Sequence, residues 1–201
     1  MAAQIMQRDA PGFFGKIPSH GDFVARRLPP GFTGPWDAWL QAGMADSQAR
    51  LGDAWLAVYL NSPIWRFALG AGVCGPQACY GVMMPSVDRV GRYFPFTIAA
   101  AGAPGRRCAP SAVWYAALEA QALAALTVEL SPQYHDAALV ALAATLADSG
   151  EELLPPVSIF AEGARFWRCD DARPERTGMV LYQDGLAASL FTRLLQTNAT
   201  V

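Results

Sequence analysis

The residues whose types could do chemistry gather in two short segments of the chain, residues 12–24 and residues 85–96. Each segment combines glycine, proline, aromatic and charged residues, a mixture that is typical of loops rather than of core strands. The first contains Ser19, His20 and Asp22, the side-chain types of a hydrolase triad. Triads assemble from separated segments, because serine, imidazole and carboxylate must line up in space and immediate neighbours rarely do so. We therefore predict that Asp22 or Ser19 hydrogen-bonds the turn backbone and that His20 is exposed.

The second segment contributes Asp88, Arg89 and Arg92. A guanidinium group binds a carboxylate or a phosphate through paired hydrogen bonds, so these arginines suit an acidic or phosphorylated segment of a partner. The alternatives are ordinary solvation and an internal ion pair between Asp88 and an arginine, and the sequence leaves them open. Two further arginine pairs have the same ambiguity, Arg26 with Arg27 and Arg106 with Arg107.

Residues 70–75, Gly-Ala-Gly-Val-Cys-Gly, match the glycine spacing of a dinucleotide-binding loop. That loop requires a helix that opens at the last glycine and faces the pyrophosphate with its amino terminus. Here Pro76 follows at once, and the next regular element is predicted to be a strand. The segment is therefore predicted to be a hairpin turn, and no cofactor is expected.

Metal binding is the remaining chemistry that the residue types allow. The cysteines and histidines have neither paired-cysteine nor helical ligand spacing. We expect buried reduced thiols, a solvated His135 in the first turn of a helix, and no metal-ligating or catalytic residue. The residues concerned are Cys74, Cys79, Cys108, Cys169, His20 and His135.

Composition limits the class of protein. The chain has 201 residues, of which 53% are hydrophobic and 16% charged, with a formal net charge of −2. A single domain over residues 1–201 is expected, disorder is not, and nucleic acid is an unlikely partner without a basic excess. The amino terminus lacks the pattern of a secretory signal, and the apolar stretch 137–147 is about half a bilayer span. We expect a cytoplasmic protein without membrane insertion.

The elements that must position the two segments follow from hydrophobic periodicity. A strand is predicted over residues 12–17, and a helix is predicted to begin at Pro35. Gly52 interrupts this helix, and residues 61–63 end its continuation. Its apolar stripe comprises Trp36, Trp39, Leu40, Gly43 and Met44, and then Trp55, Leu56, Tyr59 and Leu60.

Three strand-like runs, residues 64–69, 78–84 and 93–101, are separated by short turns and predict an antiparallel meander. Pro95 in the third run indicates an edge strand or a bulge, because proline has no N–H to donate. Later elements are predicted helices over residues 111–130 and 132–148, strands over 157–160, 165–168 and 178–182, and a final helix with Leu186, Leu190, Phe191, Leu194 and Leu195 on one face. Strands grouped with strands and helices with helices predict an α+β fold, a largely antiparallel sheet covered by helices.

The chain resembles the TagF (ImpM) family of type VI secretion-associated proteins. The resemblance rests on residues 12–24, 35–40 (Pro-Trp-Asp-Ala-Trp-Leu), 62–68 (Ser-Pro-Ile-Trp-Arg-Phe-Ala) and 85–95 (Pro-Ser-Val-Asp-Arg-Val-Gly-Arg-Tyr-Phe-Pro), in this order. It implies a longin-like fold and a non-enzymatic cytoplasmic protein that represses the secretion machine after translation. The implied partner is its forkhead-associated scaffold protein. The alternatives are a phosphohydrolase and a passive assembly component.

The resemblance brings no catalytic, cofactor-binding or metal-binding residue with it. It implies instead that the polar motif residues of the two segments lie on the surface and contact the partner, while Trp36, Trp39 and Trp65 are structural. The candidate partner-binding residues are Lys16, Asp22, Asp88, Arg89 and Arg92.

Overall fold

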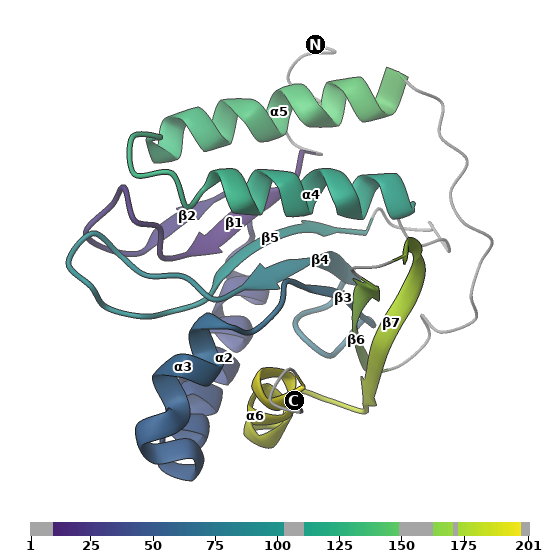
Figure 1. The fold of residues 1–201 in the computed structure, drawn as a ribbon. Helices are drawn as coiled ribbons and strands as arrows, with labels where there is room; N and C mark the ends of the chain where they lie inside the picture. Colours follow the sequence, from purple (N-terminus) through teal and green to yellow (C-terminus); the bar gives the residue numbers. More distant parts are fainter. Residues whose placement is uncertain (1–9, 103–110, 149–162, 171–172, 198–201) are drawn as a thin grey trace.

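The structure is a computed structural model, and it describes residues 10–102, 111–148, 163–170 and 173–197. Helices and strands alternate in groups along the chain, with one 3₁₀ turn, Gly52–Ala54, between the first two helices (Figure 1). The strands are β1 (Gly12–Gly15), β2 (Val24–Arg26), β3 (Trp65–Leu69), β4 (Cys79–Met84), β5 (Phe96–Ala101), β6 (Ala164–Asp170) and β7 (Arg173–Gln183). The helices are α2 (Pro30–Leu51), α3 (Trp55–Leu60), α4 (Ala112–Ala124), α5 (Pro132–Asp148) and α6 (Ala188–Gln196).

The described strands form one sheet in the order β2-β1-β5-β4-β3-β6-β7. Every pairing in it is antiparallel. The predicted meander is confirmed as β3-β4-β5, and the turn over residues 70–75 joins β3 to β4, as expected. The α+β prediction, with an antiparallel sheet covered by helices, is therefore confirmed.

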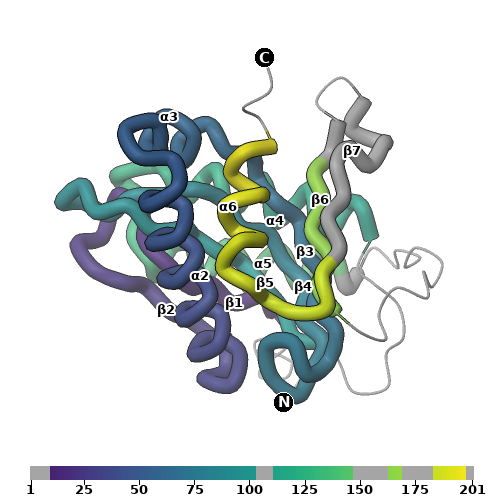
Figure 2. Tube along the Cα trace, turned by 90° about the horizontal axis from the view of Figure 1, so that it is seen from below, coloured from purple at the N-terminus to yellow at the C-terminus, as the bar shows by residue number. Residues whose placement is uncertain are grey.

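Helices cover both faces of the sheet, with α4 and α5 on one side and α2, α3 and α6 on the other (Figures 1 and 2). The interior strand β3 is consequently buried along its whole length. Its side chains alternate between two cores: Trp65, Phe67 and Leu69 belong to the core under α2 and α6, and Ala68 belongs to the core under α4.

The predicted tryptophan stripe is confirmed on the buried face of α2. Trp36 and Trp39 are 0% and 4% exposed, and each indole N–H is bonded: Trp36 Nε1 donates to Thr97 Oγ1 at 3.0 Å and Trp39 Nε1 to the Ala187 carbonyl at 2.9 Å. Gly43 lets α6 approach closely, because a Cβ there would lie 2.4 Å from Cβ of Phe191. In α3, Trp55 and Tyr59 are buried as predicted, whereas Leu56 and Leu60 are exposed.

Two expectations about prolines are wrong. Helix α2 begins at Pro30 instead of Pro35, because Pro29 is extended and Pro30 already supplies the fixed φ of a first helical residue. Pro35 lies inside the helix and cannot donate to the carbonyl of Gly31, so the helix continues with one backbone hydrogen bond fewer. Pro95 marks neither an edge strand nor a bulge, because β5 begins after it at Phe96 and lies between β1 and β4.

The later elements follow the prediction with shifted ends. Helix α4 ends at Ala124, before the predicted 130, and the following residues form a turn. The predicted strands 165–168 and 178–182 lie within β6 and β7, while the predicted strand 157–160 lies outside the described residues. The final helix is confirmed as α6, with Leu190, Phe191, Leu194 and Leu195 buried, whereas Leu186 lies before its first residue, Ala188. Within the described ranges, every helix is too short or too polar to cross a bilayer.

Candidate functional site

The loop that follows β1 is the first of the two segments rich in special residues. His20 N donates to the Ile17 carbonyl at 3.1 Å, which closes a tight turn. Asp22 Oδ1 accepts from the backbone N–H of Phe23 at 2.8 Å, and His20 is exposed, so both predictions about this loop are confirmed. An aspartate engaged with its own turn and an imidazole directed to solvent do not form a triad.

Asp88 organises the second segment, the connection between β4 and β5. Its Oδ1 accepts from the backbone N–H groups of Val90 at 3.0 Å and Arg92 at 2.9 Å. Its Oδ2 accepts from Arg92 Nε at 2.7 Å and lies 3.1 Å from Lys16 Nζ. The Asp88 side chain is fully buried, and all its partners but Lys16 belong to its own loop. The carboxylate therefore holds the loop in one conformation.

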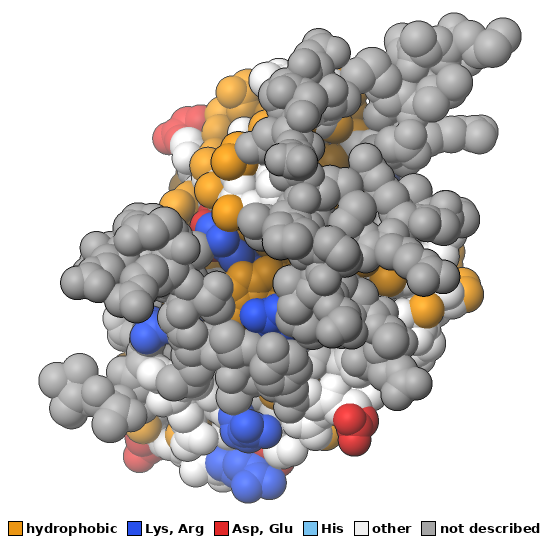
Figure 3. Space-filling model, turned by 90° about the vertical axis from the view of Figure 1, so that its right-hand side faces the viewer, with side chains coloured by type: hydrophobic (Ala, Val, Ile, Leu, Met, Phe, Trp, Pro, Cys, Tyr) orange, Lys and Arg blue, Asp and Glu red, His pale blue; other side chains and the backbone are white. Residues whose placement is uncertain are grey.

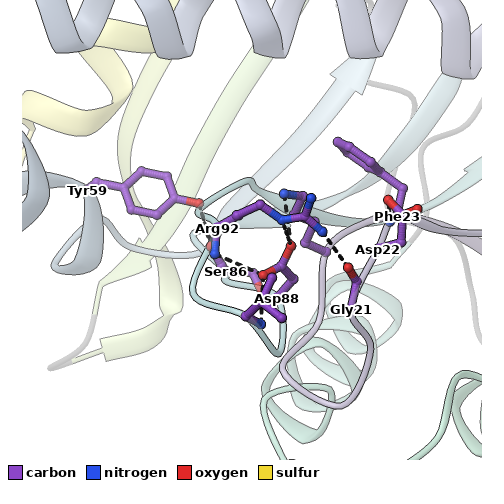
Figure 4. A network of polar contacts seen from close by, with 9 residues as sticks. Gly21, Asp22, Phe23, Tyr59, Ser86, Asp88 and Arg92 are labelled. Carbon is purple, nitrogen blue, oxygen red and sulfur yellow. Dashed lines mark hydrogen bonds and ion pairs between the residues drawn. The ribbon is translucent and has the colours of Figure 1, made fainter.

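Three contacts join the two segments into one unit, and Figure 4 shows the one between Arg92 and Gly21. Lys16 pairs with Asp88, Arg89 N donates to the His20 carbonyl at 2.9 Å, and Arg92 Nη2 donates to the Gly21 carbonyl. Residues 16–23 and 85–95 are called the motif-loop unit below. The sheet brings its two halves together, because β1 pairs with β5 and both loops leave the same end of that pair.

Gly15 permits this junction. It has a φ of +132°, and a Cβ there would lie 2.1 Å from the Pro95 carbonyl oxygen. Any side chain at this position would force β1 and the second loop apart.

Tyr59 of α3 holds the start of the second loop of the motif-loop unit at Ser86. Its hydroxyl donates to the Ser86 carbonyl at 2.9 Å and accepts from Ser86 N at 3.0 Å (Figure 4). Burial raises the pKa of the Tyr59 hydroxyl far above its usual value, so the group stays protonated and keeps its donor role. From the sequence, Tyr59 is predicted only as a member of an apolar stripe. Its contact with Ser86 is not predictable, because a hydrogen-bond partner far along the chain leaves no local pattern.

Burial by itself would raise the pKa of Asp88. The hydrogen bonds from Arg92 and Val90 and the ammonium group of Lys16 outweigh burial and hold the pKa of Asp88 well below its usual value. The carboxylate is therefore ionised at neutral pH and serves as the brace of the unit rather than as a proton donor or acceptor.

Replacing Asp88 with asparagine should remove an acid-sensitive part of the stability. The pKa of Asp88 is lower in the folded protein than in the unfolded chain, so the unfolded state takes up the proton first as the pH falls below about 4. The stabilisation by the ionised carboxylate is thus complete at neutral pH and declines in acid. We expect Asp88→Asn to melt at a lower temperature than the wild type at about pH 7, and the difference to shrink towards about pH 3 in thermal melts followed by circular dichroism.

The matched control for this change is Asp22→Asn, which alters an exposed carboxylate of the same unit. It should shift the melting temperature much less than Asp88→Asn does. A difference between Asp88→Asn and the wild type that stays constant from neutral to acid pH would contradict the role of the ionised carboxylate.

The structure corrects the expected surface position of two candidate residues. Lys16 is 6% exposed and Asp88 is 3% exposed, because each neutralises the other inside the unit. Asp22, Arg89 and Arg92 are exposed, as expected. The internal aspartate–arginine pair that the sequence left open is formed by Arg92, which also bonds the first loop.

Arg89 differs from Arg92 although both are exposed arginines of the same loop. Its backbone is bonded to His20, but no hydrogen bond or ion pair reaches its guanidinium group from the described residues. The guanidinium lies over the first loop, with Nη2 3.3 Å from the position of a Cβ on Gly21. Its charge is thus available on the surface of the unit.

Two apolar residues of the unit were missed as candidates. Phe23 is 42% exposed and Val90 is 65% exposed. Their positions in the sequence could have identified them. Each stands among glycine and charged residues in a turn, where core packing does not require an apolar side chain.

The remaining candidates are structural groups. Cys74 and Cys79 are buried free thiols, and burial raises the pKa of Cys74 to about 12 and that of Cys79 to about 11, so both stay protonated at neutral pH. Cys108 and the side chain of Cys169 lie outside the described part, as does Arg106 with Arg107. Arg26 is exposed, while Arg27 binds the Pro11 carbonyl and pairs with Asp136 of α5.

The expectation that His135 is solvated is wrong. Its residue is 3% exposed, and burial lowers the pKa of its imidazole. Position in the first turn of a helix gave no sign of this burial. The same turn of α5 also carries Asp136, which pairs with Arg27. In the ranges that the structure describes, no group of three histidine, cysteine or acidic residues could hold a metal ion.

The face beside β6 and β7 shows the distribution of charge on another side of the molecule (Figure 3). The lysine and arginine side chains of the described residues visible there form small separate groups between hydrophobic and uncharged areas.

Comparison with known proteins places this architecture in a family. Residues 12–142 match the family model of the TagF N-terminal domain, described as type VI secretion system-associated. The crystal structure of PA0076 from Pseudomonas aeruginosa PAO1 is similar, with 32% sequence identity and a TM-score of 0.74 over 92% of this chain and 94% of that one. No curated protein matches the chain. The motif-loop unit lies within the matched region, and the chain belongs to the TagF family of type VI secretion system-associated proteins.

Proposed function

We propose that this protein is a non-enzymatic, post-translational repressor of a bacterial type VI secretion system, and that it acts in the cytoplasm by binding the forkhead-associated scaffold protein of that system. Membership of the TagF family supports a role in type VI secretion. The observation that carries the step to a binding protein is the motif-loop unit. Its two carboxylates bind groups of the unit itself, whereas Arg89, Phe23 and Val90 have exposed side chains.

A non-enzymatic role agrees with the use of the polar groups in the unit. Asp88 is committed to two cations and two backbone N–H groups, and Asp22 caps its own turn. A phosphohydrolase would need carboxylates free to bind metal, or a nucleophile beside a base. Residues already engaged in holding loops are poorly suited to either task.

The test is co-purification of the tagged protein with the forkhead-associated scaffold protein from the same bacterium, together with measurement of secretion on overexpression. We expect a stable complex and reduced secretion. Reproducible absence of the complex, with secretion unchanged, would contradict the proposal.

Two further assays separate the alternatives. Release of phosphate from the phosphorylated scaffold by the purified protein with divalent metals would indicate an enzyme. A fluorescent fusion that stays in the assembled apparatus would indicate a passive assembly component, since a repressor should be released or excluded.

A further inference from the structure

The outer surface of the motif-loop unit combines the Arg89 guanidinium, to which no described side chain is paired, with two exposed apolar side chains. Val90 follows Arg89 directly, and Phe23 stands two positions after Gly21, over which the Arg89 guanidinium lies. Arginine and aromatic residues, phenylalanine included, are enriched at the cores of protein interfaces relative to the rest of the surface. All three residues belong to the motif-loop unit, which therefore offers a partner one charged and two apolar contact groups.

The backbone that carries these side chains is already fixed. Arg89 N donates to the His20 carbonyl, Val90 N to Asp88 Oδ1 at 3.0 Å, and Phe23 N to Asp22 Oδ1 at 2.8 Å. A partner that binds here therefore has to order few additional backbone torsions, and less of the interaction energy is lost.

The Phe23 ring is held in the same way. Its centroid lies 5.7 Å from that of Phe14 in a stacked arrangement and 4.8 Å from that of Phe94 edge-on. Lys16 Nζ lies 5.1 Å from the ring centroid. One part of the ring is thus packed against the unit while the rest stays exposed, which presents a rigid apolar surface to a partner.

The charge of the unit favours an acidic partner. The cations Lys16, Arg89 and Arg92 outnumber the acids Asp22 and Asp88, and Asp88 is already paired with Lys16 and Arg92. This leaves the Arg89 guanidinium as the exposed cation to which no described carboxylate is paired. A planar guanidinium suits a carboxylate, with which it forms two parallel hydrogen bonds.

We propose that Arg89, Phe23 and Val90 form the docking surface for an acidic segment of a partner protein. A glutamate or aspartate carboxylate of that segment pairs with Arg89, and a neighbouring apolar side chain packs on Phe23 and Val90. This inference rests on the proposed function, since the partner is the forkhead-associated scaffold protein. It adds the contact residues and the chemistry that they recognise.

The experiment measures the affinity of the full-length protein for the purified scaffold protein by isothermal titration calorimetry. We expect Arg89→Glu and Val90→Asp each to weaken binding by at least ~10-fold, because both place a negative charge opposite the acidic segment. The milder Arg89→Gln should weaken binding by ~5-fold, and it keeps the test valid if the charge-reversed variant misfolds. Binding should also weaken at high salt.

The chain offers matched controls for both changes. Arg193→Glu makes the same charge change on α6, and Val128→Asp makes the same change at a valine that is 61% exposed in the α4–α5 turn. Both should bind within about twofold of the wild type. All variants should retain the circular dichroism spectrum of the folded protein.

The outcomes separate this inference from the proposed function. If the wild type binds and the Arg89 and Val90 variants bind equally well, the docking surface is wrong while the proposed function stands. If dephosphorylating the scaffold abolishes wild-type binding, the docking surface binds a phosphorylated residue, and the proposal of a glutamate or aspartate ligand is wrong. If the wild type does not bind at all, the proposed function and the docking surface both fail.

Discussion

Replacing Trp39 with alanine is expected to lower the free energy of unfolding by about 3–5 kcal/mol. The side chain is 4% exposed and packs against Trp36, Phe166 and Phe191, so its loss leaves a large cavity between α2, α6 and the sheet. The change also leaves the Ala187 carbonyl at the start of α6 without its indole donor. Urea denaturation followed by circular dichroism measures the effect.

Two variants calibrate this prediction. Trp39→Phe keeps most of the aromatic contacts and loses the N–H, so it should cost about 1–3 kcal/mol. Leu60→Ala removes an apolar side chain that is 53% exposed on α3 and should cost about 0.5 kcal/mol or less. A wild-type denaturation curve for Trp39→Ala would contradict the core assignment.

Replacing Glu119 with alanine is expected to destabilise the protein by roughly 2–4 kcal/mol. Arg66 of β3 donates through Nε and Nη2 to the two carboxylate oxygens of Glu119 on α4, both at 2.7 Å, and its side chain is only 7% exposed. Removing the carboxylate leaves a charged guanidinium under α4 without these two bonds. The Glu119 side chain is 21% exposed, which places the expected cost at the lower end of the range for buried pairs.

The double variant Arg66→Met with Glu119→Leu tests the cause. If the loss comes from a buried guanidinium that has lost its two bonds to Glu119, apolar residues of similar volume should restore most of the stability that Glu119→Ala removes. If the single variant Glu119→Ala is as stable as the wild type, the ion pair between Arg66 and Glu119 contributes no more than a solvent-exposed ion pair does. Urea denaturation again provides the measurement.

Much of the fold is predictable from the sequence because its signals are local. The tryptophan spacing of α2, the meander β3-β4-β5 and the apolar face of α6 all depend on residues close together in the chain. The Ser131–Pro132 start of α5 is of the same kind, and Ser131 Oγ accepts from Tyr134 N at 3.2 Å as a helix cap should.

The arrangement of the sheet could not be predicted in the same way. The insertion of β1 between β2 and β5, and the pairing of β3 with β6, depend on contacts between distant segments for which neither periodicity nor turn chemistry gives a sign. The burial of His135 was not predicted either, because its position in the first turn of α5 is equally compatible with an exposed side chain.

The candidate site was predictable as two unusual segments but not as one unit. Residue types identified the loops, and the possible Asp88–arginine pair was among the alternatives. Burial of Lys16 and Asp88 was not predictable, because charged residues in a loop normally face water and only the partner from the other segment makes burial favourable. Phe23 and Val90 were overlooked because apolar residues are usually assigned to the core.

The pairing of β1 with β5 also determines when the motif-loop unit can exist. Gly21 and Arg92, which bond each other, are 71 positions apart, and β5 follows Arg92 in the chain. During synthesis the first loop therefore leaves the ribosome long before its counterpart, and it stays incomplete until β5 has emerged to pair with β1. A peptide of residues 12–24 alone would lack both Asp88 and Arg89, so the outward surface of the unit belongs to the folded chain and not to either motif by itself.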